Sequence, residues 1–178
     1  RVESGGVATT NWLIKHGAYV TVTDLKDENY LEPSLRKLNG GPKLRLNGHD
    51  KKDIEDNEII VFNPDVSIKN PFVKYAQKIG RQIENDATIF YKLCPRSIIA
   101  VTGTRGKTTT ASWTGHLISG QFKTIVSGNS YAEPLLKTID RLNPISNSRE
   151  LENRNFVVNE IPSYHLEYFD RTIPAPAI

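Results

Sequence analysis

The 178-residue sequence contains no methionine and only one cysteine, Cys94. A single cysteine excludes an internal disulfide framework and a cysteine-based zinc cluster, so we expect a reducing compartment, the cytoplasm. No apolar run is long enough to cross a bilayer and no signal-peptide pattern opens the chain, so we expect no membrane association. Because the sequence starts at Arg1 and lacks methionine throughout, we expect it to be part of a longer protein.

The sequence also has little net charge, +3 at pH 7, from 23 Lys and Arg against 20 Asp and Glu. The basic residues are scattered rather than clustered, so no nucleic-acid partner is expected. The four histidines show no paired metal-ligand spacing, which argues against a zinc site. Hydrophobic residues make up 38% of the chain, enough for a globular core, and we expect Trp12 and Trp113 to lie in it because both fall on helical faces.

The most informative pattern is a strand, a turn and a helix in the second half of the chain. A β-branched run over 97–102 leads into Gly103-Thr-Arg-Gly-Lys-Thr-Thr109, and a helical pattern covers 107–119. Backbone N–H groups at a helix N-terminus, together with a lysine, form a cradle for polyphosphate. The strict phosphate-loop pattern fails, because Val101 stands where that pattern requires glycine. We still interpret this turn as a nucleotide-binding turn.

This interpretation assigns chemistry to particular side chains. The residues expected to bind ATP are Gly103, Thr104, Arg105, Gly106, Lys107, Thr108 and Thr109. Lys107 would neutralise the β- and γ-phosphates, and the Thr108 hydroxyl would bind Mg²⁺. A later strand pattern, 156–160, ends in Glu160. Ligands gather outside the carboxyl ends of parallel strands, so we expect Glu160 on the same edge as the turn, where it can hold a metal ion. Lys107 and Glu160 are the candidate catalytic residues.

Strand and helix patterns alternate along the chain, which predicts an α/β fold with parallel sheets. The expected strands are 19–23, 43–46, 59–62, 81–84, 97–102, 124–127 and 156–160, and the expected helices are 7–16, 35–38, 71–79, 87–93, 107–119 and 135–142. Residues 26–33 and 143–155 are expected to be polar loops. We place a domain boundary at Cys94-Pro-Arg96, so that 1–94 form a Rossmann-like domain and 95–178 form part of a P-loop-type ATPase domain.

The first residues contain half of a dinucleotide-binding motif. Gly5 and Gly6 open the first helix, and Asp24 lies 18 positions after Gly6, at the end of the next strand. A dinucleotide-binding fold places a carboxylate on a ribose hydroxyl at a similar spacing. The preceding strand and the first glycines of that motif are absent, so an ordinary helix start followed by an acidic turn is an equal alternative.

Together these motifs resemble the Mur ligases. The resemblance rests on 101–109, Ser127-Gly-Asn129, Pro134-Leu-Leu136 and Glu160-Ile-Pro-Ser-Tyr-His-Leu-Glu167, and more loosely on Ser4-Gly-Gly6, 17–24, Gly48-His-Asp50, Asn63-Pro-Asp-Val66 and Asn85-Asp86. It covers essentially the whole chain and is closest to the family member that adds D-glutamate to UDP-N-acetylmuramoyl-L-alanine. It implies an ADP-forming amide ligase of peptidoglycan synthesis that uses ATP and Mg²⁺.

The resemblance also implies a mechanism and further roles. In such enzymes the substrate carboxylate attacks the γ-phosphate of ATP, and the amine of the incoming amino acid displaces phosphate from the acyl phosphate. Metal binding falls to Thr108 and Glu160, and substrate binding to Ser4, Gly5, Asp24, Lys26, Asn129 and His165. Residues 1–94 would bind the UDP substrate, and a C-terminal domain for the amino acid would lie beyond Ile178. This stretch alone is expected to be monomeric and inactive.

Three departures from the family pattern bear on these roles: Arg105 replaces asparagine, Asp65 replaces glycine and Pro162 replaces serine. Other functions remain open, namely another Mur-type ligase with a different amino acid, a folylpolyglutamate or poly-glutamate synthase, and a non-catalytic module that binds a nucleotide-sugar. A P-loop kinase or GTPase is disfavoured, because the sequence shows no recognisable base-specificity motif. A uridine pocket at Asp24 would separate the peptidoglycan ligase from its folate relatives.

Overall fold

The computed structural model describes residues 5–128, 134–142 and 155–169. Helices and strands alternate, and the described strand pairs are parallel, which confirms the predicted α/β class. The chain divides into two compact units, Arg1–Glu84 and Asn85–Ile178. Within the described ranges, no helix is both long and apolar enough to span a membrane.

The first unit is built from two strand pairs, each connected through a helix. Its elements are α1 (Gly5–Lys15), β1 (Thr21–Thr23), α2 (Glu28–Leu35), β2 (Lys43–Arg45), α3 (Lys51–Glu55), β3 (Ile59–Val61), α4 (Pro71–Lys78) and β4 (Gln82–Glu84). β1 pairs with β2 and β3 pairs with β4, in both cases in parallel. Each pair is therefore a strand-helix-strand unit of the kind from which Rossmann-like domains are made.

Two helices of this unit differ from the prediction. α2 occupies the region 26–33 that was expected to be a loop, and the predicted helix 35–38 is wrong. Asp27 fixes the start of α2, because its carboxylate accepts the N–H of Tyr30 at 2.8 Å. The unpredicted α3 is capped in the same way by Asp50, which accepts the N–H of Lys52 at 3.0 Å. α2 buries none of its residues, so it leaves no apolar period in the sequence.

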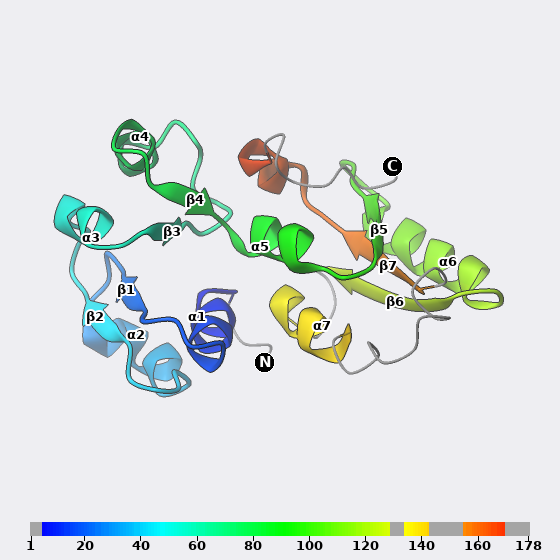
Figure 1. Cartoon of the computed structure of the whole chain (residues 1–178), viewed down its shortest axis with the longest axis horizontal. Coiled ribbons are helices and arrows are strands. Elements are labelled where there is room, and N and C mark those ends of the chain that lie inside the picture. Colours follow the sequence, from blue (N-terminus) through cyan, green and yellow to red (C-terminus); the bar gives the residue numbers. More distant parts are fainter. Residues whose placement is uncertain (1–4, 129–133, 143–154, 170–178) are drawn as a thin grey trace. The chain divides into compact units, whose positions relative to one another are not determined.

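The second unit contains a parallel sheet with strands in the order β5-β7-β6 (Figure 1). Its elements are α5 (Asp86–Leu93), β5 (Ser97–Val101), α6 (Lys107–Ser119), β6 (Lys123–Gly128), α7 (Leu135–Leu142), β7 (Asn155–Glu160) and the 3-10 helix η3 (Ser163–Tyr168). The contacts place α5 with this unit, where it packs against α7. The division thus falls at Glu84 and Asn85, before α5, and not at the predicted position after it.

Alternating side chains of β7 distinguish the two faces of this sheet. Glu160 meets Thr108 of α6, whereas Asn159 meets Tyr91 of α5. Successive residues of a strand point to opposite faces, so α6 covers one face and α5, with α7, covers the other. Val157 and Val158, one on each face, are fully buried.

The packing of α6 corrects one expectation about the core. Trp12 of α1 is buried as predicted, but Trp113 of α6 is 65% exposed. Ala111 and Gly115 are the buried residues of α6, and Trp113, midway between them, lies on the opposite side of the helix.

Gly115 provides a test of this packing. A Cβ at this position would lie 2.4 Å from Cγ2 of Val126 in β6, and a β-branched valine has little rotamer freedom to move away. Gly115→Ala is therefore expected to lower the free energy of unfolding by about 1–3 kcal/mol, despite the better helix propensity of alanine.

Gly120→Ala is the matched control, because a Cβ there meets nothing within 4 Å and φ is −68°. We expect this variant to be unchanged or more stable by about 0.5 kcal/mol. Urea unfolding followed by circular dichroism measures both variants, and equal effects would contradict the described contact between α6 and β6.

Candidate functional site

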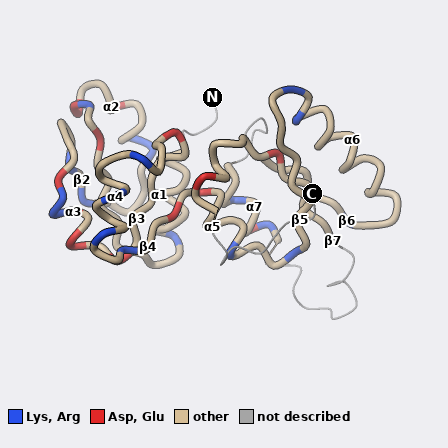
Figure 2. The backbone as a smooth tube through the Cα atoms, turned by 90° about the horizontal axis from the view of Figure 1, so that it is seen from above, with Lys and Arg blue, Asp and Glu red and all other residues tan. Residues whose placement is uncertain are grey.

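The turn between β5 and α6 is shaped to receive an anion. Gly103 (φ 144°) and Gly106 (φ 76°) both adopt positive φ values, which residues other than glycine rarely adopt. Among the described residues, no side chain caps the N-terminus of α6, and the first amides of a helix are the backbone groups that can bind an anion. The Lys107 ammonium donates to the Gly103 carbonyl at 2.9 Å and so lies over the turn. Figure 2 shows basic positions along this turn.

Glu160 lies at the start of α6. The Thr108 hydroxyl donates to Glu160 Oε2 at 2.9 Å, and Glu160 is only 4% exposed. The strand register sets Glu160 beside Val101 of β5 and Gly128 of β6. The turn and the acid therefore share one edge of the sheet, as the strand order predicts. Their roles in binding ATP and metal remain predictions.

Gly128 allows β6 to approach Glu160 closely. A Cβ at Gly128 would lie 2.3 Å from the Glu160 carbonyl oxygen and 2.8 Å from its Cβ, and φ at Gly128 is 137°. Any side chain here would collide with the backbone of β7. In the sequence this glycine stands out only as part of a motif, because its packing role depends on a strand distant in sequence. The predicted substrate residues Asn129 and Ser4 lie outside the described residues.

Thr108 and Glu160 offer the kind of donors that Mg²⁺ prefers, a hydroxyl and a carboxylate oxygen. Over the described part of the chain, no group of three or more His, Cys, Asp and Glu could hold a metal. A Mg²⁺ ion here would therefore take its other ligands from nucleotide phosphates and water, which is its usual mode of binding. The residues present fit such an ion.

His165 lies on η3, which follows β7, and is close to an acid to which the sequence patterns assign no role. Its Nδ1 is 3.8 Å from Oδ1 of Asp86, the first residue of α5. Burial raises the pKa of the Asp86 carboxyl, and the neighbouring His165 opposes that increase. The only hint of Asp86 in the sequence was the pair Asn85-Asp86 at a strand-to-helix junction. Such a pair indicates a helix cap and does not point to His165.

The remaining predicted substrate residues belong to the first unit. Gly5 begins α1. Asp24 follows β1, and its carboxylate accepts the N–H of Lys26 at 2.9 Å. The Thr23 hydroxyl and the His49 imidazole interact at 2.8 Å, so the last residue of β1 and the segment after β2 meet at the carboxyl edge of this strand pair. Asp24 and Lys26 thus occupy the edge at which a parallel sheet binds ligands.

A buried polar network lies on the other face of the sheet at the level next to Glu160. The Tyr91 hydroxyl donates to Asn159 Oδ1 at 3.0 Å, and Asn159 Nδ2 donates to Ser127 Oγ at 3.3 Å. This network joins α5 to the two strands that end at the site. Burial raises the pKa of the Tyr91 hydroxyl.

The known proteins that this chain resembles in sequence are named as ligases. A UDP-N-acetylmuramoylalanine--D-glutamate ligase of Geobacter metallireducens is 34% identical over 175 residues, which cover 97% of this chain and 36% of that protein. Proteins of the same name from Roseiflexus sp. and Treponema pallidum are 39% and 36% identical, over 81% and 75% of this chain and 32% and 26% of theirs.

Among solved structures, a pseudomurein peptide ligase type C from Methanothermus fervidus aligns with 89% of this chain and 32% of its own, at 25% identity and a TM-score of 0.41. No protein-family model matches the chain. The chain spans about a third of the length of the curated relatives.

The Tyr91 network generates a prediction about pH. Because the pKa of Tyr91 is raised in the folded state above its ordinary value of about 10, the stability it contributes is complete below about pH 10 and is lost at higher pH. Tyr91→Phe is expected to cost about 1 kcal/mol at pH 7, since Asn159 loses its donor, and to reduce the loss of stability above pH 10. Tyr30→Phe, at a side chain 66% exposed, is the control. Urea unfolding between pH 7 and pH 11 measures both, and superimposable profiles for Tyr91→Phe and the parent would contradict the assignment.

Proposed function

The chain is related to the Mur ligases over nearly its whole length, and from this premise we propose that it forms the ATP-binding part of an ADP-forming amide ligase. The observation that carries the proposal is the 2.9 Å hydrogen bond from Thr108 to Glu160. It joins the helix that follows a phosphate-type turn to an acid on the neighbouring strand. These are the two parts that a Mg²⁺-nucleotide site requires.

Each residue of this edge has a role in the proposed reaction. The first amides of α6 would bind phosphate oxygens. Lys107, which now donates to the Gly103 carbonyl, would turn to the β- and γ-phosphates. Thr108 and Glu160 would hold Mg²⁺, whose positive charge would stabilise the phosphoryl group during transfer. Arg105 and the remaining residues of the turn, Thr104 and Thr109, complete the nucleotide site. Catalysis here is positioning and charge stabilisation, with no covalent nucleophile from the chain.

The substrates are proposed from the relatives. Those proteins are named as ligases of UDP-N-acetylmuramoylalanine and D-glutamate, and we assign the same pair to the protein that contains this chain. The first unit, with Gly5, Asp24 and Lys26, would bind the UDP portion, and His165 would face the muramoyl-alanine portion. The enzyme would act in the cytoplasm, where ATP and UDP-linked precursors are available. A Mur-type ligase for another amino acid, or a folate-type relative, is the second candidate, because the chain spans only about a third of its relatives.

Lys107→Ala tests the nucleotide site directly in this chain. Loss of one charge-assisted contact to phosphate is worth about 1.5–3 kcal/mol, so we expect Mg²⁺-ATP to bind about ten- to a hundredfold more weakly. Isothermal titration calorimetry measures the dissociation constant.

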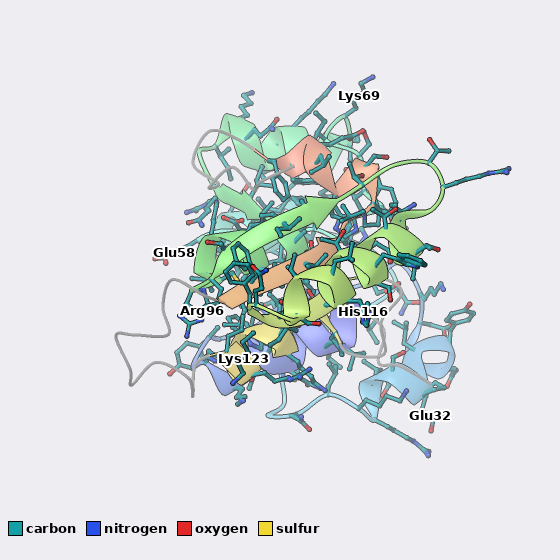
Figure 3. The ribbon with its side chains drawn as sticks, turned by 90° about the vertical axis from the view of Figure 1, so that its right-hand side faces the viewer. Glu32, Glu58, Lys69, Arg96, His116 and Lys123 are labelled. Atoms are coloured by element: carbon teal, nitrogen blue, oxygen red, sulfur yellow. The ribbon has the colours of Figure 1, made fainter. Side chains whose placement is uncertain are left out.

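Lys123→Ala is the matched control, because Lys123 begins β6 at the opposite end of the sheet. Figure 3 shows Lys123 and Arg96 near the end at which β6 and β5 begin. Equal affinities for the parent and Lys107→Ala would contradict the nucleotide site. A comparable loss in Lys123→Ala would instead indicate a non-specific charge effect.

The complete reaction is tested on the longer protein that we expect to contain this sequence. Phosphate release is measured with ATP, UDP-N-acetylmuramoyl-L-alanine and a panel of D- and L-amino acids. Activity with D-glutamate alone supports the proposal, activity with a different amino acid supports the second candidate, and no activity with any of them contradicts a ligase. We expect this chain alone to release no phosphate in the same assay.

A further inference from the structure

We propose that a further parallel strand pairs with β5 along the side that faces away from β7. This strand is another segment of the same polypeptide, because the chain spans only about a third of its curated relatives. The pairing is inferred from the topology of the second unit and does not depend on the proposed function.

β5 has the composition of an interior strand. Among the described residues it pairs with β7 alone, so one side of its backbone has no partner strand there. Its sequence, Ser97-Ile-Ile-Ala-Val101, contains no charged residue and no proline, the residue types that protect the edges of natural sheets. Residues 98–101 are only half-buried, whereas Val157 and Val158, their neighbours on β7, are fully buried. A continuous apolar run of this kind is typical of a buried parallel strand.

The connections within the sheet indicate where a further strand can be added. β5 leads through α6 to β6 on one face of the sheet, and β6 leads back through α7 to β7 on the other face. Crossovers between parallel strands are right-handed. On the face that α5 and α7 cover, a right-handed crossover therefore moves in the direction from β6 toward β5.

After β7 the chain continues on this same face. The ring of Phe169, near the end of the described part of the chain, lies 4.9 Å from the ring of Tyr91 on α5. A right-handed crossover that starts here must again move toward β5. Because β5 already occupies the position next to β7, the strand that it reaches lies beyond β5. The outer edge of β6 could be reached from this face only by a left-handed crossover.

An added parallel strand would also extend the candidate site. The carboxyl ends of parallel strands share one edge of a sheet, so the new strand would end beside Glu160 and the turn at 103–107. Side chains that follow it would then lie next to the bound nucleotide. This consequence, unlike the pairing, rests on the proposed function.

The backbone of β5 carries two sets of amides that distinguish its two sides. The Val101 carbonyl accepts the N–H of Ile161, in the segment after β7, at 3.0 Å. The backbone groups of successive strand residues point to opposite sides, so the N–H groups of Ile99 and Val101 face β7. Those of Ile98 and Ala100 face the other side, and we call them the edge amides.

Hydrogen exchange tests the pairing residue by residue, measured by mass spectrometry with electron-transfer fragmentation on this chain and on the longer protein, both without ligand. In this chain the edge amides of Ile98 and Ala100 should exchange rapidly. In the longer protein they should exchange about a hundredfold more slowly, because they then open only with the sheet. Ile99 and Val101, which face β7 in both proteins, are the internal controls. Rapid exchange of the edge amides in the longer protein would overturn the proposal.

Ala100→Pro provides an independent measurement. Proline removes an N–H that faces away from β7, so the urea midpoint of this chain should change little. The midpoint of the longer protein should fall, since a bond to the added strand is lost. An equal loss in both proteins, or no loss in either, would overturn the proposal.

Two further outcomes separate the alternatives. Protection of the edge amides that appears in this chain at high protein concentration would assign the edge to a second copy and would overturn the proposal. Slowed exchange in the longer protein together with absent Mg²⁺-ATP binding would support the added strand and contradict only the proposed function.

Discussion

The parallel register of β5, β7 and β6 is the constraint on which the candidate site depends. It places Val101, Glu160 and Gly128 at one level, so the turn before α6, the acid and the exit of β6 converge. A shift of β7 by one residue would direct Glu160 toward α5 and Asn159 toward α6, because side chains alternate between faces. The Thr108 hydroxyl and the Tyr91 hydroxyl would then lose their acceptors together. The bonds from Thr108 to Glu160 and from Tyr91 to Asn159, on opposite faces of β7, therefore both depend on the same register.

The sequence predicted the second unit more completely than the first, for physical reasons. The bounds of α6 and α7 match the prediction, because a glycine turn precedes α6 and Pro134 precedes α7. α2 and α3 were missed because capping carboxylates, rather than a buried apolar stripe, define them. The boundary at Cys94-Pro-Arg96 was inferred from the junction between two strand-helix patterns, but α5 packs against α7, in the second half of the chain, and so belongs to the second unit.

The same distinction applies to the site. The alternation of strands and helices in the sequence is enough to predict that Glu160 shares an edge with Lys107, because the carboxyl ends of parallel strands lie at the same edge of the sheet. The Asp86–His165 pair could not be predicted, since nothing in the local pattern of either residue names the other. The need for glycine at Gly128 also arises only when β6 meets β7. Contacts between distant segments are therefore what the sequence does not reveal. Trp113 was wrongly expected in the core because α6 carries apolar residues on more than one side, and only its contacts with the sheet show which side is buried.

The two tryptophans also supply a spectroscopic means of following each half of the molecule. Trp12 is buried in the first unit and stacks on His16 with ring centroids 4.1 Å apart, whereas Trp113 is solvent-exposed on α6 of the second. A buried indole emits at shorter wavelength than a hydrated one, so one fluorescence spectrum contains two resolvable contributions. The blue component reports on the unit that carries Asp24, and the red component reports on the helix that begins at Lys107.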